Sequence, residues 1–112
     1  MLVVFVTPLF ANNISSFDTL SLAKQCQILA VNLDKLVEEQ TDDICELILD
    51  DASYNVETAG TSITYLLYSA ASRSLQDAIR ELKAAESLSC ENPAKISLYL
   101  NEVSQIYNQI KD

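Results

Sequence analysis

The chain has 112 residues, 49% of them hydrophobic, which suits one domain with one core. Its net charge is −9 and it lacks clustered lysines and arginines, which argues against nucleic acid as a partner and disfavours an anionic membrane surface. One glycine and two prolines leave few residues for tight turns, so a helical fold is expected rather than an all-β one.

The N-terminus is a nearly continuous apolar run, Leu2–Phe10, that ends at the small residue Ala11. This pattern is typical of a secretory signal peptide cleaved after Ala11, although the usual basic residues at its start are missing. We therefore expect residues 1–11 to be a signal peptide, 12–17 a linker and 18–112 one helical domain of a periplasmic or extracellular protein. The alternative is a cytoplasmic protein with a buried N-terminal segment. The run is too short to span a bilayer, so no stable membrane span is expected.

Apolar residues recur every three or four positions through the rest of the chain, which indicates amphipathic helices. Asp18, Thr41 and Asn92 are suited to cap helices, and Pro93 suits a first helical turn. The sequence predicts an all-α, antiparallel up-down four-helix bundle. The expected helices cover residues of about 18–39, 42–58, 62–87 and 93–110.

The single glycine, Gly60, decides between two arrangements. The apolar periodicity continues through it, which favours one long helix and three helices in all. Glycine is unfavourable in helix interiors and common just beyond helix ends, and Thr61 or Ser62 is suited to cap the start of a following helix. We therefore expect the chain to turn at Gly60.

The three cysteines are Cys26, Cys45 and Cys90. In the bundle, Cys45 at the start of the second helix and Cys90 after the third lie at the same end. A Cys45–Cys90 disulfide is therefore expected, with Cys26 left as a buried thiol. The alternative is three reduced, buried cysteines. With no histidine and no Cys-x-x-Cys pair, we expect no metal site.

No catalytic or cofactor motif stands out, so we expect neither an enzyme nor a bound cofactor. Ser21-Leu-Ala-Lys24 matches the Ser-x-x-Lys pattern of penicillin-recognising enzymes, but their other motifs are missing. The segment Asp51–Glu57 resembles the opening of a calcium loop without its required glycine and final glutamate.

The strongest local signal is acidic charge, with nine acids and one base between Asp34 and Glu57. Glu39, Asp43, Glu46 and Asp50 follow helical spacing and form one stripe, with Tyr54 beyond it. This stripe predicts a face that docks a basic protein partner, in an inhibitor, immunity factor, chaperone or assembly subunit. Solubility alone is the simpler interpretation. A bundle that holds a small apolar ligand is the alternative function. The sequence is also compatible with a homo-oligomer.

Overall fold

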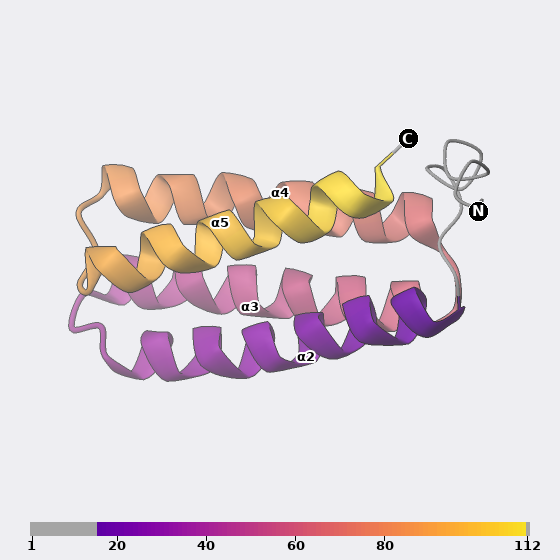
Figure 1. The fold of residues 1–112 in the computed structure, drawn as a ribbon. Coiled ribbons are helices and arrows are strands. Elements are labelled where there is room, and N and C mark those ends of the chain that lie inside the picture. The colour runs from indigo at the N-terminus through magenta and orange to yellow at the C-terminus, as the bar shows by residue number, and fades with distance from the viewer. Residues whose placement is uncertain (1–15, 112) are drawn as a thin grey trace, which may run out of the picture.

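The computed structural model describes residues 16–111, which form four α-helices. The helices are α2 (Ser16–Glu38), α3 (Asp43–Thr64), α4 (Tyr68–Ser87) and α5 (Pro93–Ile110). Each helix runs antiparallel to the one before it, so the chain passes up and down an elongated bundle (Figure 1). The predicted all-α four-helix bundle is therefore confirmed. The signal-peptide prediction for residues 1–11 lies outside the described residues.

Three helix boundaries differ from expectation, the start of α2 by two residues and the end of α3 and the start of α4 by six each. α2 begins at Ser16, so the last two residues of the expected linker are helical. The predicted turn at Gly60 is wrong, because α3 continues through it to Thr64. The alternative long helix is also wrong, because the chain turns at Tyr65–Leu67 and α4 starts at Tyr68.

Gly60 allows α3 to approach α2 closely. A Cβ atom at this position would lie 2.9 Å from the Cβ of Cys26 and 3.3 Å from the backbone oxygen of Ala23. The same interface contains buried Ser53, whose Oγ is 3.0 Å from the carbonyl oxygen of Ala30. Gly60 therefore serves the close packing of two helices and does not mark a helix end.

The turn after α3 is built around a residue that is not glycine. The amide of Leu66 donates to Ile63 O at 2.9 Å, and that of Leu67 donates to Ser62 O at 2.8 Å. These are the two bonds of a Schellman motif, which needs a left-handed residue at its C′ position. Leu66 supplies it with φ of 62°, at a cost of about 1–2 kcal/mol for an L-residue.

The helix starts also differ from expectation in detail. The residue that caps α3 is Asp42 and not Thr41, because its carboxylate accepts a hydrogen bond of 3.0 Å from Cys45 N. Asn92 does occupy the N-cap of α5 ahead of Pro93, but its backbone is left-handed and its side chain makes no capping bond.

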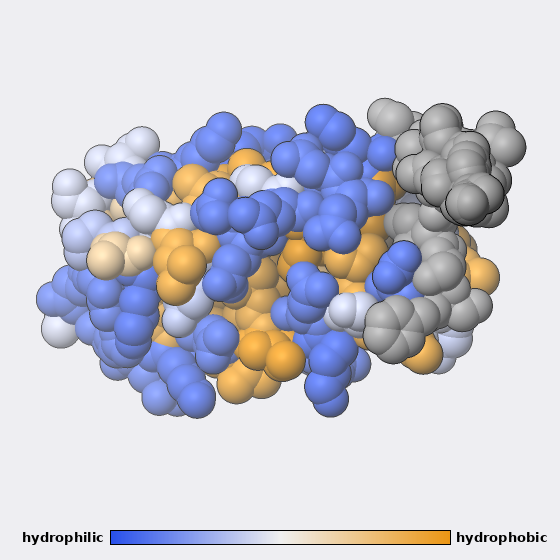
Figure 2. Space-filling model, in the orientation of Figure 1, coloured by the Kyte–Doolittle hydropathy of each residue, from blue (hydrophilic) through white to orange (hydrophobic). Residues whose placement is uncertain are grey.

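The core follows the predicted stripes with a few shifts. On α3, Leu49 is fully buried, while its neighbour Ile48 is only partly buried. α2 contacts α5 less than it contacts α3, and Figure 2 shows apolar side chains along that seam. A shallow surface hollow there is lined by Ile28, Leu29 and Ile106 among others. The largest fully buried side chains are Leu22, Leu33, Leu36, Leu49, Ile63, Leu75, Leu82 and Ile96.

Replacing Gly60 by alanine tests the close approach of α2 and α3. Alanine is the better helix former by about 1 kcal/mol, but its Cβ would meet the Cβ of Cys26. We expect Gly60→Ala to lower the free energy of unfolding by about 1–3 kcal/mol in denaturant titrations, as overpacking does. Thr61→Ala, on the exposed side of the same helix, is the matched control and should be neutral or slightly stabilising. A stabilised Gly60→Ala would contradict the packing role.

Candidate functional site

Most of the predicted docking residues share one face of α3. Asp43, Asp50 and Tyr54 are exposed and Glu46 is partly exposed. They lie opposite the buried stripe that includes Leu49 and packs against the rest of the bundle. The structure therefore brings four of the five predicted residues together on a single solvent-facing surface.

Glu39 lies apart from this face, in the turn that follows α2. Its carboxylate accepts hydrogen bonds from Asn92 Nδ2 at 2.8 Å and from Lys95 Nζ at 3.0 Å. The bond from Asn92 and then that from Lys95 lower the pKa of Glu39, and Glu39 in turn raises the pKa of Lys95. Its charge is thus engaged with the start of α5.

The face also carries residues that the acidic stripe did not reveal. Asp51 and Glu57 are exposed on the same helix, which has five acids and no lysine or arginine between Asp43 and Thr64. Leu47 is exposed seven residues before Tyr54, so both lie along the middle of the face. The seven-residue spacing of Leu47 and Tyr54 could have placed them on one face of the helix from the sequence. The buried apolar residues of α3 follow the same helical spacing, so this pair did not stand out. We call this surface, with Asp43, Glu46, Leu47, Asp50, Asp51, Tyr54 and Glu57, the acidic face.

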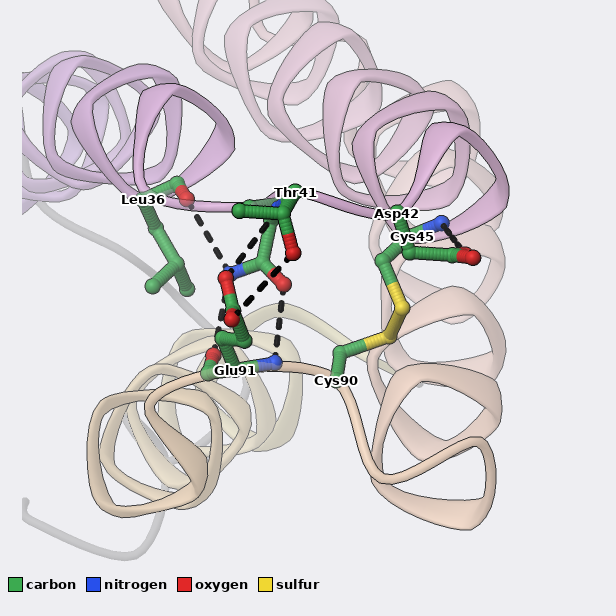
Figure 3. Close-up of a disulfide and its surroundings, with 7 residues drawn as sticks. Leu36, Thr41, Asp42, Cys45, Cys90 and Glu91 are labelled. Atoms are coloured by element: carbon green, nitrogen blue, oxygen red, sulfur yellow. Dashed lines mark hydrogen bonds between the residues drawn. A yellow bond between two sulfur atoms is a disulfide. The ribbon is translucent and has the colours of Figure 1, made fainter.

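The end of the bundle where α3 begins is closed by the predicted disulfide. Cys45 and Cys90 are bonded, with their Cα atoms 5.7 Å apart, and both are buried (Figure 3). The bond joins the first turn of α3 to the turn between α4 and α5. Cys26 is the free buried thiol that was expected, and burial raises its pKa to about 12.

A polar clasp lies beside the disulfide and joins the turn between α2 and α3 to the turn between α4 and α5 (Figure 3). Buried Gln40 pairs with the backbone of Glu91: its Nε2 donates to Glu91 O at 2.9 Å and its Oε1 accepts from Glu91 N at 2.8 Å. The Glu91 carboxylate accepts from Thr41 N at 3.1 Å and from Thr41 Oγ1 at 3.3 Å. No sequence motif predicts these hydrogen bonds. They fix the entry of α3 and thereby the orientation of the acidic face.

Within residues 16–111, no group of three or more His, Cys, Asp or Glu side chains is arranged to hold a metal ion. None of the four described helices is long and apolar enough to cross a membrane.

Comparison of the chain with protein-family models, curated proteins and solved structures gives no match.

The disulfide closes a loop of 45 residues, for which chain entropy predicts a contribution of about 4 kcal/mol. We expect Cys45→Ala/Cys90→Ala to lose about that amount of unfolding free energy in guanidinium titrations. Non-reducing peptide mapping of the wild type should recover the Cys45–Cys90 peptide pair. A loss below about 1 kcal/mol would mean that the clasp alone holds the two turns.

The Glu39 contact predicts a pH dependence of stability. Because the folded-state pKa of Glu39 lies below its unfolded value, its contribution is present above the unfolded pKa and is lost as pH falls through the folded one. Glu39→Gln should therefore be less stable than wild type near neutral pH, and the two should converge in acid in urea titrations. Glu38→Gln, an exposed neighbour, is the control and should not lower neutral-pH stability. A constant difference at every pH would contradict this assignment.

Proposed function

We propose that this chain is a small exported protein-binding module that docks a basic protein partner through the acidic face of α3. The observation that carries the proposal is the composition of this one helix. Its inner side is buried in the bundle, while its outer side has five carboxylates and no base. Inhibitors, immunity factors, chaperones and assembly subunits are the kinds of protein that act by such docking.

Electrostatics supports the proposal. Like charges spaced three or four residues apart repel, and each such pair destabilises a helix by about 0.2–0.5 kcal/mol. A basic partner would relieve this repulsion and would be attracted from a distance by the concentrated charge. Exposed Leu47 and Tyr54 would add apolar contact within the acidic surround, as anchors at the centre of interfaces do.

Two features support export. A buried disulfide is typical of proteins that fold in an oxidising compartment, such as the periplasm or the extracellular space. The apolar run Leu2–Phe10 followed by Ala11 is typical of a secretory signal. Either feature alone would be weaker support than the two together.

The alternative of an apolar ligand within the core has less support. Ala71, Ala78 and Ala85 are fully buried on α4, where small side chains let helices approach each other closely. The hollow beside the disulfide, between Ile44 and Leu88, opens at the surface. We therefore favour the docking function.

Charge reversal on the acidic face tests the docking function. The full chain would capture its partner from the extracytoplasmic fraction of its source cells, and calorimetry would then measure affinity for the captured protein. We expect Glu46→Lys/Asp50→Lys to weaken binding by at least about tenfold, because two attractive charges become repulsive. Wild-type binding should also weaken from about 25 mM to about 250 mM salt.

The matched control is Asn101→Lys/Glu102→Lys/Asn108→Lys, which changes the net charge by the same amount on α5. It should leave the affinity close to that of the wild type. If both variants lose affinity equally, overall charge and not the acidic face governs binding. If neither loses affinity, the partner docks elsewhere and the docking function proposed for α3 is wrong.

A further inference from the structure

The end of the bundle opposite the disulfide exposes four large apolar side chains. Three are consecutive in the turn between α3 and α4: Tyr65 is 70% exposed, Leu66 62% and Leu67 56%. Leu20, near the start of α2, is 65% exposed, and α2 begins at this same end of the bundle (Figure 1). There the hydroxyls of Thr19 and Tyr68 lie 2.7 Å apart and tie α2 to α4. We call Leu20 and Tyr65–Leu67 the apolar tip.

Local backbone chemistry does not favour leucine at two of these positions. Leu66 adopts a left-handed conformation, which glycine or asparagine tolerates better. Leu67 occupies the N-cap of α4, where it provides no capping hydrogen bond and where serine or aspartate is preferred. Because both side chains are exposed, burial in the bundle does not compensate. Unfavourable residues that packing does not explain point to a function at this turn.

Charge is distributed unevenly between the two ends. The half of the bundle that contains the apolar tip (residues 16–27, 54–77 and 102–111) carries four acids and three bases, for a net charge of −1. The half that contains the disulfide (residues 28–53 and 78–101) carries eleven acids and four bases, for a net charge of −7. The net charge that disfavoured a membrane surface thus belongs to the disulfide half.

The surroundings of the apolar tip complete the pattern. The segment Thr58–Ser72, which contains the turn, has no charged residue. Arg73 follows it on α4, where it donates to Ser69 Oγ, and Lys111 follows α5 at this end of the bundle, over the ring of Tyr107 (Figure 1). The acid nearest to Leu20 in the sequence is Asp18, on the first turn of α2. Exposed leucines beside a tyrosine, with basic side chains farther from the turn, suit a lipid surface, in which acyl chains lie beneath a headgroup region that contains the phosphates.

We propose that the apolar tip docks on the surface of a lipid bilayer. The leucines enter the boundary between headgroups and acyl chains, Tyr65 lies at headgroup level, and Arg73 and Lys111 face lipid phosphates. A projecting turn suits a lipid surface, because a bilayer is deformable and can bury three neighbouring side chains without a preformed pocket. The proposal uses no residue of the acidic face, so it is independent of the protein partner.

The chain has no tryptophan, so a single introduced tryptophan reports its own surroundings. Leu67→Trp places the reporter in the apolar tip, and Ile44→Trp places it at the disulfide end, at a position that is 58% exposed. Each full-length variant would be mixed with vesicles of phosphatidylcholine and phosphatidylglycerol that contain brominated lipid. We expect a blue shift and strong quenching at position 67, and neither at position 44.

The apolar run Leu2–Phe10 is a competing source of lipid binding in the full chain, and it precedes α2, which begins at the same end of the bundle as position 67. The variant Leu66→Asn/Leu67→Ser described next keeps this run and removes two leucines of the turn, so it separates the two sources. Vesicle binding without quenching at position 67 would assign the binding to another segment and overturn the proposal. Equal quenching at both positions would indicate unspecific adsorption and would overturn it as well.

A second variant keeps the fold while it removes the leucines. Leu66→Asn/Leu67→Ser puts favoured residues at the left-handed and N-cap positions, so its melting temperature should equal or exceed that of the wild type. We expect its partition onto the same vesicles to fall at least about tenfold, because two exposed apolar side chains are lost. Ile44→Ser/Leu88→Ser removes two exposed apolar side chains at the disulfide end and should bind vesicles as the wild type does. Unchanged vesicle binding by Leu66→Asn/Leu67→Ser would refute the proposal. If the apolar tip binds a protein and not vesicles, its ligand is that protein and the lipid proposal is wrong.

Discussion

The close approach of α2 and α3 is the constraint on which the bundle depends. Gly60 leaves room for the Cβ of Cys26, and Ser53 fits beneath Ala30 while its hydroxyl lies 2.6 Å from Asp34 Oδ1. Larger residues at these positions would push the helices apart, because packed interiors have little free volume. With α2 on one side and α4 on the other, α3 has only its outer surface left for solvent, and that surface is the acidic face.

The two ends of the bundle are held in different ways. At one end, the Cys45–Cys90 bond and the pairing of Gln40 with the Glu91 backbone join the two turns covalently and by hydrogen bonds. At the other end, the turn Tyr65–Leu67 is held by its own backbone bonds, and its side chains project outward. The first end is therefore fixed by a covalent bond and side-chain hydrogen bonds, while the second exposes three consecutive large side chains in a single turn.

The sequence predicted what depends on periodicity and on chain direction. Four amphipathic stripes gave the bundle, and antiparallel neighbours placed Cys45 and Cys90 at the same end, where the disulfide forms. The turn could not be predicted, because glycine marks both helix ends and close helix contacts, and at Gly60 only the neighbouring Cys26 distinguishes them. Nor does a leucine such as Leu66 signal a left-handed residue. The sequence also does not distinguish Gln40 from a surface glutamine, because its partner, the Glu91 backbone, is brought beside it only by the fold.

Distance lets one small bundle carry two chemically opposite surfaces. Asp43 and Glu57, the first and last carboxylates of the acidic face, precede Tyr65 by 22 and 8 residues, which corresponds to about 33 Å and about 12 Å along a helix. Both distances exceed the Debye length of about 8 Å at physiological ionic strength, so these carboxylates are largely screened from anything that touches the apolar tip. The net charge of −9 is therefore a poor guide to what either end can bind. Because α3 connects the two surfaces as a rigid helix, a partner at one end need not exclude a partner at the other.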